Sequence, residues 1–241
     1  MAESRIDGGR ALLLGAFVAL GVLGWEVSAL WPLKLLAVLG HETGHAIAAK
    51  LVGGEVNQIT VAPNQGGSCL SMIPDGFFGR VMVSSGGYVG AAIISALLLL
   101  LTFRWNLGRK MLAATSVWLV LIGLLYGRDL FTFIFCGVMA AVCGLAARFF
   151  PLGVVSAFNL FMATFTALYA VMDLKDDLWN GAVRAQSDAQ ILADATHIPA
   201  IFSAFIWTLM SVAVVGVGAW YAVRRPAGAA IPAARKPVRA L

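Results

Sequence analysis

The sequence predicts an all-α polytopic membrane protein with about seven transmembrane helices and a short β-hairpin insert after the second. Of its 241 residues, 60% are hydrophobic and only 12% are charged, whereas soluble domains carry about 25% charged residues. Several apolar stretches approach or reach the roughly 20 residues that a helix needs to cross a bilayer. A polar segment with alternating side chains follows the second stretch and is typical of a β-hairpin.

The apolar stretches divide the chain into its expected helices. We place spans at residues 11–31, 33–52, 79–103, 111–127, 130–149, 153–172 and 199–223. Residues 1–223 then form a single membrane-embedded domain, because no long polar stretch remains for a soluble core. Residues 224–241 are rich in Pro, Ala and Arg, and we expect a basic, disordered tail.

The polar insert lies between residues 53 and 76. Residues 55–61 alternate polar and apolar side chains, residues 64–67 (Asn-Gln-Gly-Gly) have turn chemistry, and residues 68–73 can return as a second strand. The predicted hairpin thus covers about residues 55–73. Two interpretations stay open: a plain surface turn, or an open strand edge that holds an extended peptide.

The net charge of +5 is unevenly distributed. The tail and the 104–110 connection are basic, whereas residues 173–194 are mostly acidic. With seven spans, the positive-inside rule puts the tail and the 104–110 connection in the cytoplasm, and the N-terminus and the acidic segment outside. So short a basic tail favours contact with anionic membrane lipid and argues against nucleic-acid binding.

The most informative motif is His41-Glu42-Thr43-Gly44-His45, within an apolar stretch. Residues four apart lie on one face of a helix, so His41 and His45 can bind one Zn²⁺, and Glu42 can act as general base. Polar groups are costly in a bilayer, which favours a functional role. The alternative is two histidines packed against neighbouring helices without metal.

A catalytic zinc ion needs a third protein ligand. Asp173, at the end of the sixth span, is our choice, and Asp177 or Asp176 on the following turn could share the site or orient a ligand. The alternative is that these three carboxylates form a solvated helix end. Asp75 lies in a Pro-Asp-Gly turn and is a weaker candidate, and His197 is the remaining histidine.

Small residues open the third span. The sequence Gly86-Gly87-Tyr88-Val89-Gly90 allows close approach to another helix, and the helix with Gly40 and Gly44 is the expected neighbour. Asn159, in the sixth span, either positions substrate or makes a hydrogen bond between helices, and we favour the hydrogen bond.

With these motifs in view, the chain resembles the intramembrane zinc metalloproteases of the site-2 protease type, in a small branch that lacks a PDZ or other soluble domain. The resemblance covers about residues 33–220 and depends on residues 40–46 with Gly53-Gly54 after them, residues 86–90, and residues 169–177 followed by Ser187-Asp188-Ala189.

The resemblance implies a zinc endopeptidase with His41, His45 and Asp173 as zinc ligands and Glu42 as the catalytic base. It also implies a membrane-protein or peptide substrate and an integral protein of the bacterial inner (plasma) membrane. Two other hypotheses stay open: an inactive zinc-holding scaffold or partner-binding protein of the same family, and a transporter. The sequence identifies neither the substrate nor the oligomeric state.

Overall fold

The structure, a computed structural model, describes residues 6–179 and 187–224, without the side chains of 173–179. Its regular elements are α1 (Gly8–Leu23), a short 3-10 helix (Ser28–Leu30), α2 (Trp31–Leu51), β1 (Glu55–Val61), β2 (Gly67–Met72), α3 (Phe77–Phe103), α4 (Gly108–Leu125), α5 (Leu130–Phe149), α6 (Leu152–Trp179), α8 (Asp188–Thr196) and α9 (Ala200–Val223). The prediction of a mostly helical chain with one hairpin insert is confirmed.

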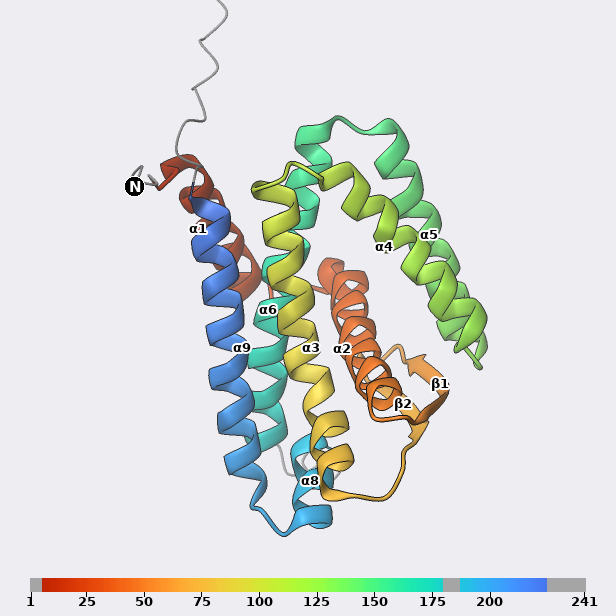
Figure 1. Cartoon of the computed structure of the whole chain (residues 1–241). Coiled ribbons are helices and arrows are strands. Elements are labelled where there is room, and N and C mark those ends of the chain that lie inside the picture. Colours follow the sequence, from red (N-terminus) through yellow and green to blue (C-terminus); the bar gives the residue numbers. More distant parts are fainter. Residues whose placement is uncertain (1–5, 180–186, 225–241) are drawn as a thin grey trace, which may run out of the picture.

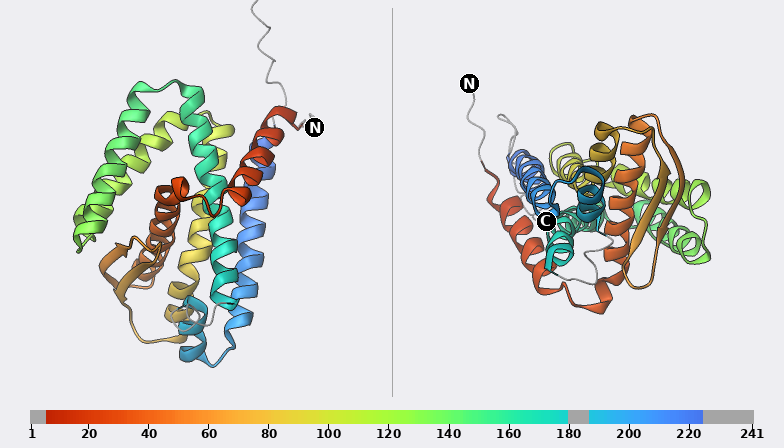
Figure 2. Two further views of the ribbon diagram at one scale, coloured as in Figure 1. Left: turned by 180° about the vertical axis from the view of Figure 1, so that it is seen from behind. Right: turned by 90° about the horizontal axis from the view of Figure 1, so that it is seen from below.

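The long helices lie roughly side by side (Figure 1). Helices α3, α6 and α9 form one group with α1 beside it, while α4 and α5 form a helical hairpin that diverges from this group. Helix α2 lies between the two groups and ends at the β-hairpin (Figure 1, Figure 2). Short helix α8 lies at the same end of the molecule, below α3 and α9. The helix with the His-Glu-x-x-His motif is therefore central.

The first two apolar stretches form two helices with a sharp bend between them. Within the described residues, five helices are long and apolar enough to cross a membrane, and the count is up to six if the bent pair is one span. That pair, Gly8–Leu23 with Ser28–Leu51, is bent by 114°. The structure thus has fewer spans than the seven expected, because two stretches predicted to cross separately make one broken span or a re-entrant segment.

The two ends of the described chain lie together. The Asp7 amide donates to the Val223 carbonyl oxygen at 2.8 Å, and Ile6 pairs with Arg224 in an isolated antiparallel bridge. Ile6 and Arg224, the two ends of the described chain, are therefore neighbours. The predicted cytoplasmic side of the C-terminal tail stays a prediction.

Apolar and polar residues are both buried along α2. All positions from Lys34 to Ala46 are buried, although the helix carries the polar motif residues. The helix packs against α3, α6 and both strands of the hairpin, and Trp118 of α4 reaches it by donating its Nε1–H to Thr43 Oγ1 at 3.3 Å. Burial keeps water from His41, Glu42 and His45, so these polar groups must find partners within the protein.

Glycines bring α2 and α3 into backbone contact. A Cβ atom at Gly86 would lie 2.8 Å from the Gly44 carbonyl oxygen, and one at Gly90 would lie 2.9 Å from the Gly44 Cα atom. At Gly44 a Cβ atom would collide with the Gly86 carbonyl oxygen. The predicted packing of the glycine-rich third span against the motif helix is confirmed, and Gly44 is the residue at its centre.

The β-hairpin packs one face on α2 and one edge on the α4–α5 connection. The Ile59 amide donates to the Tyr126 carbonyl oxygen at 3.0 Å, and the Val61 amide donates to Thr132 Oγ1 at 2.9 Å. The outer edge of β1 is thus occupied. Strand β2 is the other edge of this two-stranded antiparallel sheet, and within the described part of the chain no further strand pairs with it.

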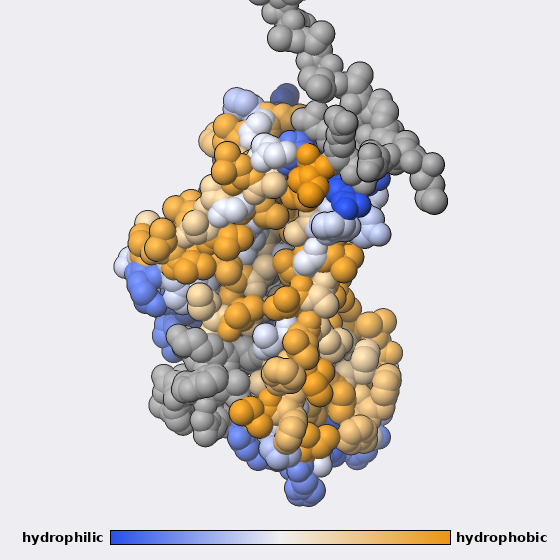
Figure 3. Space-filling view, turned by 90° about the vertical axis from the view of Figure 1, so that its left-hand side faces the viewer, coloured by the Kyte–Doolittle hydropathy of each residue, from blue (hydrophilic) through white to orange (hydrophobic). Residues whose placement is uncertain are grey.

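The surface agrees with a membrane setting. Figure 3 shows hydrophobic residues over much of the face on the α1 side, with hydrophilic residues mostly toward its ends. Large exposed apolar side chains recur along α9, such as Ile201, Phe205 and Leu209. A soluble protein rarely exposes so large an apolar area, so the chain is an integral membrane protein.

The Gly44 contact leads to a paired prediction. Gly44→Ala should destabilise the fold by about 1–3 kcal/mol, because the added methyl group forces α2 away from α3. Gly40→Ala, one turn earlier in α2, should be neutral or stabilising by up to about 1 kcal/mol, because its Cβ atom would meet nothing within 4 Å and alanine is the better helix former. Thermal unfolding in detergent checks both, and equal effects would contradict the packing contact.

Candidate metal centre

The motif residues project from α2 into the protein interior. His41, Glu42 and His45 are exposed by only 5%, 7% and 6%. The His45 Nδ1–H donates to the Val83 carbonyl oxygen of α3 at 2.6 Å, which leaves Nε2 with a lone pair. Metal-binding histidines are commonly oriented by such a backbone hydrogen bond.

A carboxylate from another element meets the two imidazoles. Asp188 is the first residue of α8, whose N-terminus is capped by Ser187 through a hydrogen bond from the Gln190 amide at 3.2 Å. Asp188 Oδ2 lies 3.0 Å from Nε2 of His41 and 3.0 Å from Nε2 of His45. The two Nε2 atoms are themselves 3.0 Å apart. Three potential ligand atoms therefore form an equilateral triangle.

This triangle fits a divalent metal ion. Tetrahedral zinc with bonds of about 2.0–2.1 Å places its ligand atoms about 3.3 Å apart, close to the 3.0 Å observed. Two histidines and one carboxylate are a ligand set typical of catalytic zinc, with a fourth position left for water. Within the described residues, His41, His45 and Asp188 are the group that could hold a metal ion.

Gly87 of α3 supplies the space beside this triangle. A Cβ atom at Gly87 would collide with the His41 ring and would lie 2.5 Å from His45 Nε2. Any other residue here would have to displace the imidazoles from their present positions. The glycine pair Gly86-Gly87 thus serves both the helix contact and the metal centre.

Negative charge gathers around the centre. Burial disfavours the charged form of Asp188, but the adjacent His45 and the hydrogen bonds with both imidazoles lower the pKa of its carboxyl below the ordinary range. Burial, followed by the nearby charges of Glu42 and Asp188, raises the pKa of the Cys69 thiol on β2 to about 12.

Glu42 lies under the β-hairpin. A Cβ atom at Gly67, the first residue of β2, would lie 2.6 Å from Glu42 Oε1 and 2.5 Å from Val38 Cγ1. The strand thus approaches the carboxylate through a residue without a side chain. This arrangement brings a buried carboxylate, a three-ligand cluster and a strand edge to one place.

An aromatic stack connects His41 to α8. Tyr88 of α3 makes an edge contact with the His41 ring, with centroids 4.6 Å apart, and stacks on Trp207 of α9 at 5.5 Å. The Trp207 Nε1–H donates to Ser85 Oγ at 2.8 Å. Tyr88 and Trp207 also share a buried cluster with Ala189 and Leu192 of α8. The same two aromatic residues therefore pack against a potential ligand and against the helix that carries Asp188.

The other predicted candidates lie elsewhere or outside the description. Asp75 is fully exposed and pairs with Arg80 at 3.4 Å, and His197 is exposed at the end of α8. The side chains of Asp173, Asp176 and Asp177 lie outside the described residues. Their roles as metal ligands, or as groups that orient a ligand, therefore stay predictions.

The sequence analysis agrees with the structure at Asn159 but missed Asp188. Asn159 donates from Nδ2 to the Gly108 carbonyl oxygen at 2.7 Å, so the predicted hydrogen bond between helices is confirmed. Asp188 was not chosen as a ligand, because carboxylates within spans were favoured over those in short polar segments. The local signal was Ser187-Asp188, a capping serine followed by an acid at the first turn of a helix.

Comparison with known proteins agrees with this geometry. A family model described as Peptidase M50B-like matches residues 13–218. No curated protein and no solved structure matches the chain. The matched range includes the His-Glu-x-x-His motif, the glycine-rich start of α3 and Asp188. The chain therefore belongs to the Peptidase M50B-like family of membrane metalloproteases.

Proposed function

We propose that this protein is an intramembrane zinc endopeptidase that hydrolyses peptide bonds of membrane-associated substrates. The observation that carries the proposal is the 3.0 Å triangle of His41 Nε2, His45 Nε2 and Asp188 Oδ2, with buried Glu42 next in sequence to His41. When bound, a zinc ion supplies a Lewis acid and lowers the pKa of its water. His41, His45 and Asp188 would hold it.

Glu42 is the general base of this proposal. It follows His41 on α2, is 7% exposed, and lies against β2 at Gly67. A carboxylate here accepts a proton from the attacking water and delivers it to the leaving amine. Its burial next to His41, close to the three potential ligand atoms, supports this role.

Asp188 takes the place of the third ligand in this proposal. Its oxygen contacts both imidazoles, and α8 is anchored beside them by the cluster around Tyr88 and Trp207. Asp173 is the competing candidate from the sequence. The two aspartates come from different elements, so substitutions separate their roles.

The free edge of β2 is a suitable site for the substrate backbone. The Ile59 and Val61 amides point away from β2, so their partners Cys69 and Gly67 are at positions where backbone groups point outward from β2. Gly67 is also the residue that contacts Glu42. A substrate segment added as a third strand would be extended, with its carbonyl groups accessible beside the base.

The ligand assignment predicts zinc content. Wild type should carry about one zinc ion per chain, His45→Ala and Asp188→Ala should carry little, and Glu42→Gln should keep its zinc because Glu42 is not a ligand. Asp173→Ala should also keep it. The measurement is metal analysis of detergent-purified protein, with elution volume and thermal unfolding as controls for folding. Zinc lost in Asp173→Ala but kept in Asp188→Ala would overturn the assignment.

The role of Glu42 predicts a large loss of rate without loss of metal. Glu42→Gln removes the base and should lower cleavage of single-span reporter proteins by about 10²–10⁴-fold. The assay follows tagged fragments in reconstituted vesicles, with Glu55→Gln, an exposed glutamate of β1, as the matched control. No cleavage by folded, zinc-loaded wild type would favour the inactive zinc-holding scaffold, and an unchanged cleavage rate in Glu42→Gln would rule out Glu42 as the base.

The strand-edge role predicts a backbone-specific effect. Cys69→Pro removes an outward amide hydrogen and should slow cleavage at least about tenfold, the equivalent of one lost hydrogen bond in a buried setting, while zinc content is unchanged. Cys69→Ala alters only the side chain and should cleave normally. Equal rates for wild type and a folded Cys69→Pro would show that the hairpin is a surface turn with no part in substrate binding.

A further inference from the structure

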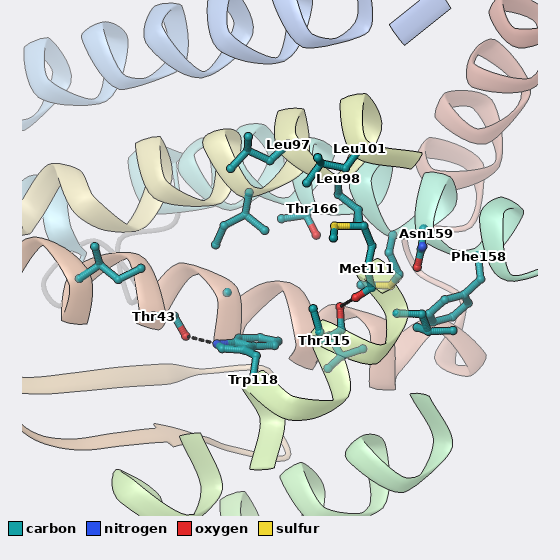
Figure 4. Close-up of a pocket in the computed structure, with 17 residues that line it drawn as sticks. Thr43, Leu97, Leu98, Leu101, Met111, Thr115, Trp118, Phe158, Asn159 and Thr166 are labelled. Carbon is teal, nitrogen blue, oxygen red and sulfur yellow. Dashed lines mark hydrogen bonds between the residues drawn. The ribbon is translucent and has the colours of Figure 1, made fainter. Parts of the chain in front are cut away.

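A large apolar cavity lies on the side of α2 away from the metal centre. Its volume is about 380 Å³, within the range of roughly 300–1,000 Å³ typical of small-molecule pockets. Helices α2, α3, α4 and α6 line it (Figure 4), through residues such as Thr43, Leu97, Met111, Trp118 and Met162. The proposed peptidase chemistry uses none of these side chains.

The lining presents hydrocarbon to any occupant. Thr43 Oγ1 donates to the Leu39 carbonyl oxygen at 2.7 Å, and Thr115 Oγ1 donates to the Met111 carbonyl oxygen at 3.1 Å. The Asn159 amide group is engaged with Gly108 at 2.7 Å. With these donors engaged, the cavity selects an apolar ligand without a polar group at its centre.

The cavity borders the lipid-facing surface. Leu97 of α3 and Ile47 of α2 both line it, and they are 49% and 52% exposed. In a membrane protein such exposed leucine and isoleucine side chains face acyl chains. An occupant can therefore enter the cavity from the bilayer past the exposed Leu97 and Ile47 side chains.

Positive charge lies at one end of the cavity. Leu101 and Met111 line that end, Arg104 follows α3 directly, and exposed Lys110 precedes Met111 in α4. Arg109 is already committed, because it donates to the carbonyl oxygens of Ala147 and Phe150. No Asp or Glu stands in the sequence between Asp75 and Asp129, so the charged residues of the α3–α4 connection itself are all positive.

We propose that this cavity binds an acyl chain of an anionic phospholipid, whose phosphate group lies at Arg104 and Lys110. The apolar lining selects the chain, and the two cations select a negatively charged headgroup over a zwitterionic one. The lipid would bridge α3 and α4 beside the catalytic helix, where the Trp118 Nε1–H donates to Thr43 Oγ1 at 3.3 Å. A lipid bound in the cavity would thereby stabilise the contact between α4 and α2, the helix that carries His41 and His45.

The first experiment compares phosphatidylglycerol with phosphatidylcholine of identical chains, added to the full-length protein in detergent. Phosphatidylglycerol at about 100 times its Kd should raise Tm by roughly 5–10 °C, and phosphatidylcholine and inorganic phosphate should raise it much less. The Arg104→Gln/Lys110→Gln variant should lose the difference between the two lipids. Ala114→Phe, which fills the cavity, should lose the shift, whereas Val117→Phe on the exposed side of α4 should keep it.

A second measurement does not depend on the folding of the filled variant. Phosphatidylglycerol with brominated acyl chains should quench the part of the tryptophan fluorescence that Trp118→Phe removes, and brominated phosphatidylcholine should quench it less. Equal responses to the two lipids, a Tm shift retained in folded Ala114→Phe, or an unquenched Trp118 would each overturn the proposal. None of these outcomes depends on zinc or on peptidase activity.

Discussion

The contact between Gly44 and the Gly86–Gly90 segment is the constraint on which the rest of the site depends. Because the backbones of α2 and α3 touch there, the Val83 carbonyl oxygen can reach His45 Nδ1 and Gly87 can lie against both imidazoles. A wider spacing between the helices would remove the hydrogen bond that orients His45. The glycines thus contribute no side-chain packing, but they let the two backbones approach closely enough to fix the positions of the ligand atoms.

This close packing also creates an electrostatic problem, because it buries carboxylates beside the two histidines. His41, Glu42 and His45 are nearly free of solvent, and an isolated charge in such surroundings is strongly unfavourable. Asp188 adds a second carboxylate to that of Glu42, with its Oδ2 atom 3.0 Å from the Nε2 atom of each imidazole. A divalent cation between these atoms would complete the charge balance, which is why the geometry is better suited to a metal centre than to histidines that serve packing alone.

Much of the fold and the core of the site could be predicted from the sequence because the relevant signals are local. The i, i+4 spacing of His41 and His45, the alternation in residues 55–61 and the small residues at 86–90 each act over a few residues. Asp188 lies 143 residues beyond His45. Its only signals in the sequence were the capping Ser187 and the stretch Ser187-Asp188-Ala189 within the family resemblance. The bend of 114° between α1 and α2 could not be predicted either. The length of an apolar stretch indicates that a helix can enter a membrane, but it does not give the direction of the helix.

The third potential ligand comes from a short helix, and this changes how assembly of the site should be understood. His41 and His45 are fixed by α2 alone, but α8 has only nine residues, too few to be stable by itself. Its position depends on packing of Ala189 and Leu192 with Tyr88 and Trp207. Since Tyr88 also contacts the His41 ring, any displacement of α8 from α3 and α9 would disturb two potential ligands together. The metal centre is therefore a property of the docked α8 as much as of the motif helix, and docking of α8 would determine whether the site is complete.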